Sequence, residues 1–137
     1  MKANLKLLAG AVALGLALPV AAATLPKAKT EHGVTYLSGG IGKDESSALK
    51  KEAKNYPLSM VFDAGRKDAY LSNVDVTIKN HAGKTVLDTV ANGPIMLVKV
   101  PAGKYTISAE EHGKTLRKTA QVKTGHDTRL NFHWPTA

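Results

Sequence analysis

Hydrophobic and polar residues alternate along three stretches in the second half of the chain. From Asn73 to Lys79, every second residue is Val or Ile and the residues between them are polar. A period of two residues is typical of a β-strand with one buried face. The same alternation covers Lys104–Ala109 and Arg129–Trp134. We therefore predict three strands whose apolar faces pack against one another.

Two further stretches, Leu58–Ala64 and Ile95–Val100, are apolar on both faces. This pattern predicts central strands, the first of them covered on its outer side by a helix. Lys118 lies at a nominally inward position between Leu116 and Ala120, so we expect a bulge or a sheet edge there. Glycines recur about every 10 to 18 residues in this part of the chain, an interval that suits strands reversing in a sandwich.

One helix is predicted, over Lys43–Tyr56. Its acidic residues fall in the first turn and its lysines toward the end, which complements the helix dipole, and Pro57 ends it. The preceding segment Gly39–Gly42 holds three glycines, which favours a turn with positive φ or a close backbone approach. Residues 24–33 are polar and without periodicity, so we expect a flexible lead-in.

The first 23 residues have the pattern of a cleavable signal peptide. Lys2 and Lys6 precede an apolar run, Leu7–Leu18, that is too short to span a bilayer comfortably. Small residues follow, and cleavage is predicted after Ala23, with Ala22 as the alternative. A retained N-terminal anchor helix is the competing interpretation. We expect an exported, periplasmic protein with no transmembrane segment after cleavage.

Composition further limits the number of domains, the covalent modifications and the class of partner that we expect. Without the leader, 114 of the 137 residues remain, enough for one domain. The chain has no cysteine, which argues against a lipid anchor at the signal junction and against disulfides. Two of its 19 basic residues fall in the leader, so 17 remain against 11 acidic ones. For an exported protein we interpret this charge as a solvated basic face or an attraction to an anionic envelope surface, and expect no nucleic-acid partner.

The central part of the chain carries a set of turn and strand motifs. They are the strand Ser72–Ile78, the turn glycine and strand of Gly83–Leu87, the pair Gly93–Pro94, and the turn Val100–Tyr105. This set resembles a carboxypeptidase regulatory-like domain, in which a Leu-Pro-x-Gly-x-Tyr turn leads into a strand, with Val here in place of Leu. The resemblance covers residues 57–123.

The resemblance implies a mainly β fold. The expected architecture is a seven-stranded Greek-key β-sandwich, similar to transthyretin (prealbumin) and to carbohydrate-binding sandwiches, with one short N-terminal α-helix. We expect this single domain to span residues 34–137.

A binding or structural role for the sandwich is the first functional hypothesis. The partner would be a periplasmic protein, a glycan or the envelope surface, and the sequence identifies no ligand-binding residue. Tyr36, Tyr56, Tyr70 and Trp134 are able to stack on sugar rings, but positions in the core are favoured because Tyr56 and Trp134 lie on apolar stripes.

An enzyme of the transthyretin-like hydroxyisourate hydrolase kind is a second hypothesis. The resemblance would then imply a Tyr-Arg-Gly-Ser terminus, whereas this chain ends with His133–Ala137. No serine lies in a Gly-x-Ser-x-Gly motif, and Ser38, Ser46 and Ser47 suit helix capping. We predict that the chain is not an enzyme, and we assign no catalytic residue and no cofactor.

Binding of copper or zinc is a third hypothesis, because the chain has five histidines. They are scattered singly, at His32, His81, His112, His126 and His133. Glu111–His112 and His126–Asp127 lie near turns and would have to converge from adjacent hairpins. No metal ligand is therefore assigned from the sequence.

A basic face for envelope binding is a variant of the first hypothesis. It requires that the basic residues near the C-terminus gather on one side, with affinity that falls as salt rises. These residues are Lys104, Lys114, Arg117, Lys118, Lys123 and Arg129.

Overall fold

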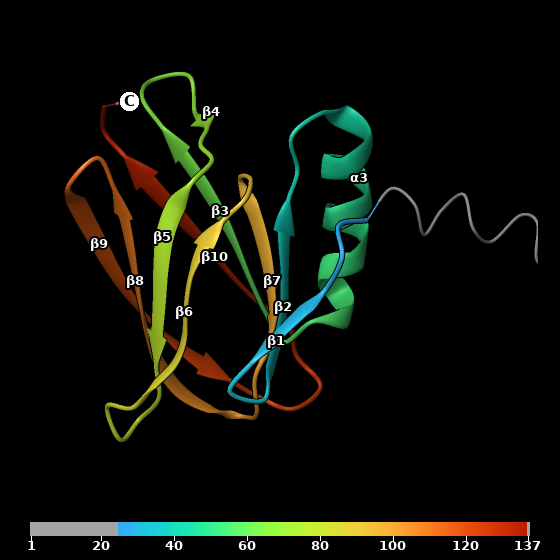
Figure 1. Ribbon diagram of the computed structural model, residues 1–137, viewed down its shortest axis with the longest axis vertical. Helices are drawn as coiled ribbons and strands as arrows, with labels where there is room; N and C mark the ends of the chain where they lie inside the picture. The colour runs from blue at the N-terminus through green and yellow to red at the C-terminus, as the bar shows by residue number, and fades with distance from the viewer. Residues whose placement is uncertain (1–24, 137) are drawn as a thin grey trace, which may run out of the picture.

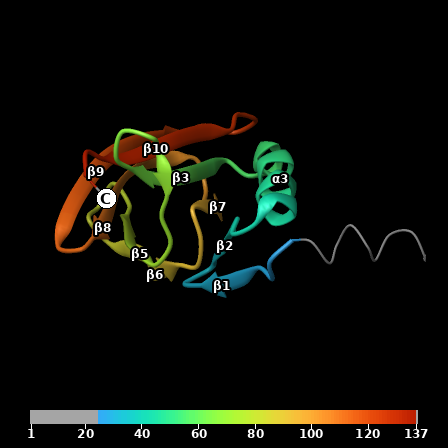
Figure 2. The same cartoon turned by 90° about the horizontal axis from the view of Figure 1, so that it is seen from above.

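The computed structural model describes residues 25–136, which form two β-sheets packed face to face with one helix outside them. The helix, α3, covers the outer face of one sheet (Figure 1), and Figure 2 shows it on the side of the molecule away from β9. The predicted mainly β sandwich with one short helix is confirmed. The predicted leader, residues 1–23, lies outside the described residues.

The first sheet has the strand order β1-β2-β7-β3-β10, with β4 beside β3. Strand β10 pairs with β3 in parallel register, and the other pairs are antiparallel. Because β10 has β3 as its sole neighbour in this order, it is an edge strand. The strands of this sheet are β1 (Lys29–Glu31), β2 (Val34–Gly39), β3 (Leu58–Ala64), β4 (Ala69–Tyr70), β7 (Ile95–Lys99) and β10 (Thr128–Trp134).

The second sheet has the order β6-β5-β8-β9 and is antiparallel throughout. Lys118 pairs with Ile107 without a register shift, so of the two expectations for Lys118 the sheet edge is correct and the bulge is not. An edge position lets a lysine leave an inward-facing register and reach solvent. The strands of this sheet are β5 (Val74–Lys79), β6 (Thr85–Ala91), β8 (Gly103–Glu111) and β9 (Lys114–Val122).

The strands follow the hydrophobic pattern closely. The three alternating stretches form β5, β8 and β10, and the two stretches that are apolar on both faces form β3 and β7. The described residues form ten strands where the resemblance implied seven, a difference that includes the short strands β1 and β4. Strand β1 lies in the segment expected to be a flexible lead-in, where it pairs with β2.

The helix is slightly shorter than the sequence pattern indicated. Helix α3 covers Lys43–Glu52 and tightens into a 3₁₀ turn, Ala53–Asn55. Tyr56 is extended, with φ −122° and ψ 137°, because the ring of the following proline disfavours helical geometry at the preceding residue. At the other end, the Gly40 N–H donates a hydrogen bond of 2.7 Å to Glu45 Oε1, which fixes the glycine loop against the first turn.

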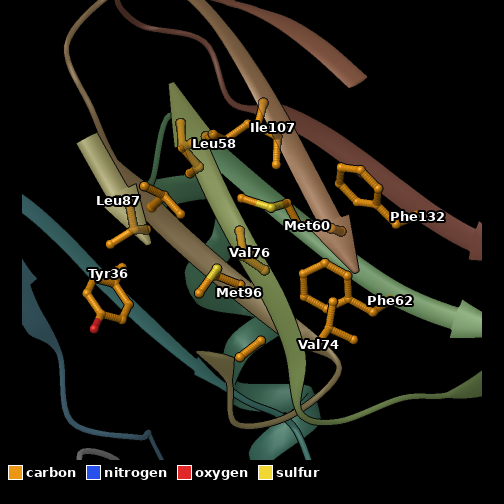
Figure 3. Close-up of a cluster of buried hydrophobic side chains, with 14 of the residues drawn as sticks. Tyr36, Leu58, Met60, Phe62, Val74, Val76, Leu87, Met96, Ile107 and Phe132 are labelled. Atoms are coloured by element: carbon orange, nitrogen blue, oxygen red, sulfur yellow. The ribbon is translucent and has the colours of Figure 1, made fainter. Parts of the chain in front are cut away.

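The main core fills the space between the two sheets. Figure 3 shows Met60, Phe62, Val76, Met96 and Phe132 among the side chains that meet there, and all five are fully buried. At roughly 25 cal/mol per Å² of apolar surface, a core of this kind supplies the main stabilisation of a domain that has no cysteine.

A second, smaller core lies between α3 and the first sheet. It consists of Leu37, Leu49, Ala53, Ile95 and Leu97. This explains why β7 is apolar on both faces, since one face meets the second sheet and the other meets the helix.

No helix within residues 25–136 is long and apolar enough to cross a membrane.

Candidate functional site

The edges of the two sheets meet where β9 runs beside β10. Trp134 Nε1 donates a hydrogen bond of 3.0 Å to the carbonyl oxygen of Lys114, and Thr128 Oγ1 donates one of 3.5 Å to that of Gln121. Between these two contacts the surface forms a groove of about 570 Å³. We call it the β9–β10 groove; it is lined by Leu116, Arg117, Lys118, Arg129, Leu130, Asn131 and His133.

The alternation of β10 explains why three of its polar side chains are exposed at the groove. Phe132 and Trp134 point into the core and are buried, so Arg129, Asn131 and His133 fall on the opposite, exposed side of the strand. On the facing strand, Arg117 and Lys118 are both exposed. The Nζ atom of Lys118 lies 5.8 Å from the centroid of the Phe132 ring, at the open edge of the sandwich.

The groove is positively charged. No aspartate or glutamate lines it, whereas Arg117, Lys118 and Arg129 do. Within residues 25–136, no carboxylate lies within 4.0 Å of the charged groups of Arg117 and Lys118. Arg117 also borders a smaller hollow of about 260 Å³ that includes Asp75 and Glu110.

Arg129 differs from the other two cations because it has a partner at the end of the groove. Its Nε and Nη2 atoms donate hydrogen bonds of 3.2 and 3.0 Å to Asp127 Oδ2. These hydrogen bonds lower the pKa of Asp127 below its ordinary value. The carboxylate is ionised at neutral pH, as an ordinary aspartate also is, and offsets part of the positive charge of Arg129.

The structure brings together half of the basic residues singled out in the sequence. Arg117, Lys118 and Arg129 line the β9–β10 groove, whereas Lys104, Lys114 and Lys123 do not. Sequence spacing alone could not separate the two sets, because the groove depends on which strands form the sheet edges.

A second cluster lies beside the groove, on the outer face of the first sheet. His133 Nδ1 is 2.7 Å from Asp63 Oδ1 and 3.4 Å from Asp68 Oδ1. Asn131 Nδ2 donates a hydrogen bond of 3.1 Å to Asp63 Oδ2. Within residues 25–136 this is the one group of three residues with metal-ligand side chains whose donor atoms lie within 4.8 Å of one another.

The two histidine pairs considered from the sequence do not converge. His112 Nδ1 lies 2.7 Å from Glu111 Oε2, but no third ligand joins this pair in the described part of the chain. His126 lines a different hollow, together with Asp127 and residues that follow the helix. Sequence reasoning thus missed Asp63 and Asp68, although Asp63 is conspicuous as the one charged residue of the mainly apolar strand β3.

The aromatic residues considered as sugar-stacking candidates are mostly structural. Tyr36 and Trp134 are buried in the core between the sheets, and Tyr56 packs against the core beneath α3. Tyr70 is 49% exposed and has Lys50 Nζ 5.6 Å from its ring centroid. None of the four lines the β9–β10 groove.

The known proteins that are similar to this chain were found by their three-dimensional structures. No family model matches it, and no curated protein does. The structure of Klebsiella pneumoniae 5-hydroxyisourate hydrolase is 18% identical, with a TM-score of 0.47, and the match covers 60% of this chain and 92% of that one. The Bacillus anthracis TIE protein is 20% identical, with a TM-score of 0.42, and the match covers 58% of this chain and 16% of that one.

These comparisons bear on two of the predictions. The prediction that the chain is not an enzyme is corrected, because one of the similar structures is a hydrolase. The carboxypeptidase regulatory-like resemblance has no matching family model and stays a prediction. At these identities neither likeness assigns an activity or a ligand to this chain, and what is established is a mainly β sandwich with a single helix.

Proposed function

We propose that this chain is an exported binding module that holds an acidic polysaccharide of the cell envelope in the β9–β10 groove. The observation that carries the proposal is the lining of the groove, which has three cationic side chains and no carboxylate. Export is inferred from the leader pattern of residues 1–23.

The shape of the groove favours an extended chain as the ligand. Two strand edges, β9 and β10, form its long sides, and the half-buried side chains of Leu116 and Leu130 provide apolar surface between the charged groups. Sugar rings present apolar faces as well as charged substituents, so an acidic polysaccharide complements both kinds of surface. A lipid surface is flat, and we expect it to make poorer contact with charges that line a groove.

We expect the anionic groups of the ligand to bind mainly to Arg117 and Lys118. They lack a carboxylate partner within the described residues, so a bound anion would not have to displace one. Hydrogen bonds to charged groups contribute roughly 1.5–3 kcal/mol each. Their loss would therefore be measurable as a change in affinity.

The proposal is tested by measuring the affinity of the purified protein for oligogalacturonate by isothermal titration calorimetry. We expect the double variant R117E/K118E to bind at least about 10-fold more weakly, since about 1.4 kcal/mol corresponds to a factor of ten. Affinity of the unaltered protein should fall as NaCl rises from about 50 to about 500 mM.

The matched control is K43E/K51E, which changes the net charge equally but alters two exposed lysines of helix α3, on the side of the molecule away from β9 (Figure 2). Its affinity should stay within about twofold of the unaltered protein, because charges beyond a Debye length of roughly 8 Å are screened. Equal losses in the two double variants would show that net charge alone drives binding. Equal binding of a neutral maltooligosaccharide, or binding only to phosphatidylglycerol vesicles, would also contradict the proposal.

A further inference from the structure

Asp63 is an unusual residue for its position. It carries a carboxylate near the end of the mainly apolar strand β3, and the residue is only 7% exposed. The parallel pairing of β3 with β10 places His133 directly opposite it. Adjacent residues in register point to the same face of a sheet, so the imidazole and the carboxylate meet at 2.7 Å. Asn131, two residues earlier on β10, holds the other carboxylate oxygen at 3.1 Å.

Asp68 joins this pair from the turn between β3 and β4. The turn is attached to β10 because the Gly65 N–H donates a hydrogen bond of 2.9 Å to the carbonyl oxygen of Trp134. A second hydrogen bond, from the Asp68 N–H to the Gly65 carbonyl at 3.3 Å, closes the turn. The fold therefore brings three donor groups together from positions far apart in the sequence.

The spacing of the donor atoms suits a metal ion between them. Two ligand atoms bound to one Zn²⁺ at tetrahedral angles lie about 3.3 Å apart, given Zn–N and Zn–O bonds near 2.0–2.1 Å. His133 Nδ1 lies 2.7 Å from one carboxylate oxygen and 3.4 Å from the other. Small rotations of the two aspartates would open the first distance to the required value.

The charge of the cluster gives an independent reason to expect a cation. Two carboxylates face one imidazole, and among residues 25–136 no lysine or arginine lies within 4.0 Å of either carboxylate. A carboxylate that is largely removed from water is costly unless a positive charge compensates it. A divalent ion would supply that charge to the nearly buried Asp63, and Asp68, whose side chain is 74% exposed, would add a second anionic ligand.

We propose that Asp63, Asp68 and His133 bind a divalent transition-metal ion, for which Zn²⁺ is the best fit. Nitrogen and carboxylate oxygen are both ordinary zinc ligands, and the imidazole disfavours Ca²⁺ and Mg²⁺. Asn131 orients the Asp63 carboxylate through a hydrogen bond to its second oxygen. Three protein ligands leave at least one coordination position for water or another ligand. Since His133 also lines the β9–β10 groove, that position lies near the end of the groove.

The test is calorimetric titration of the chelator-treated protein with ZnCl₂, together with the Zn²⁺-induced change in Tm. We expect one ion per chain and a rise in Tm, since a ligand that binds the folded state stabilises it. Asp68 is exposed, so D68N should fold normally and bind Zn²⁺ about 10-fold more weakly or worse. H133Q should lose binding to at least the same degree.

The matched control is H112Q, because His112 forms a pair with one carboxylate at the same 2.7 Å distance. This variant should bind Zn²⁺ like the unaltered protein. Unchanged affinity in D68N, an equal loss in H112Q, or no binding in the unaltered protein would overturn the proposal. D68N leaves the cations of the groove intact, so its effect on Zn²⁺ is separable from failure of polysaccharide binding.

Discussion

Gly93 is the position at which one additional atom would disturb the fold most directly. A Cβ atom there would overlap the backbone oxygen of Gly39, and no side-chain rotation relieves this overlap. The contact joins the start of β7 to the glycine loop before α3, and the Asn92 N–H donates a hydrogen bond of 2.9 Å to Ser38 Oγ beside it. The close backbone approach anticipated for the glycine segment is thus made by Gly39.

We predict that G93A destabilises the protein by about 3 kcal/mol, because overpacking against backbone cannot be relieved locally. The control is G83A, at a position with φ +83° and open space around it, which should cost about 1 kcal/mol. Urea denaturation followed by circular dichroism measures both values. A smaller loss for G93A than for G83A would mean that the two segments are not in close contact.

The residues of the candidate metal site show what a sequence pattern does and does not contain. The alternation of β10 correctly indicates that the side chain of His133 points to the exposed face of the strand, away from the buried side chains of Phe132 and Trp134. It carries no information about Asp63, which lies 70 residues earlier and meets His133 only through the parallel pairing of β3 and β10. Asp68 comes from a turn, where no periodicity exists to place it.

At the scale of elements, the β9–β10 groove exists because both strands are sheet edges. Each sheet ends at one of these strands, and side-chain hydrogen bonds rather than a backbone ladder join them within the described residues. The sequence indicated a bulge or an edge at Lys118 and an alternating strand at β10. It could not show that the two lie side by side, since strand order depends on long-range pairing.

Asp127, in the connection between these strands, limits the charge of the groove. Because hydrogen bonds from Arg129 lower the pKa of Asp127, the pair persists throughout the neutral pH range. We predict that D127N binds oligogalacturonate about threefold more tightly, since loss of this exposed, weak ion pair leaves Arg129 free to contact the ligand. Calorimetry at low salt measures the change.

The control for this variant is D44N, which removes one exposed carboxylate from the first turn of α3 and changes the net charge equally. Its affinity should match that of the unaltered protein. An increase as large as that of D127N would show that the effect comes from net charge and not from Arg129.

At the scale of the whole molecule, helix α3 and strand β9 lie on opposite sides of the sandwich (Figure 2). Helix α3 packs through Leu49 and Ala53 on the outer face of the first sheet at β2 and β7, so this part of the face is unavailable to a ligand. The sheet edges at β9 and β10 remain uncovered within the described residues. The central claim is therefore one of location, since affinity for an anion alone would be expected of many proteins with an excess of basic residues.

Mapping the contact surface by ¹H–¹⁵N NMR tests that claim most directly. The purified, ¹⁵N-labelled protein is titrated with oligogalacturonate, and shift changes are assigned residue by residue. The account predicts that the largest changes occur at residues 116–118 and 129–133, with helix α3 nearly unaffected. Changes concentrated at the lysines of α3, or spread evenly over the basic surface, would contradict it.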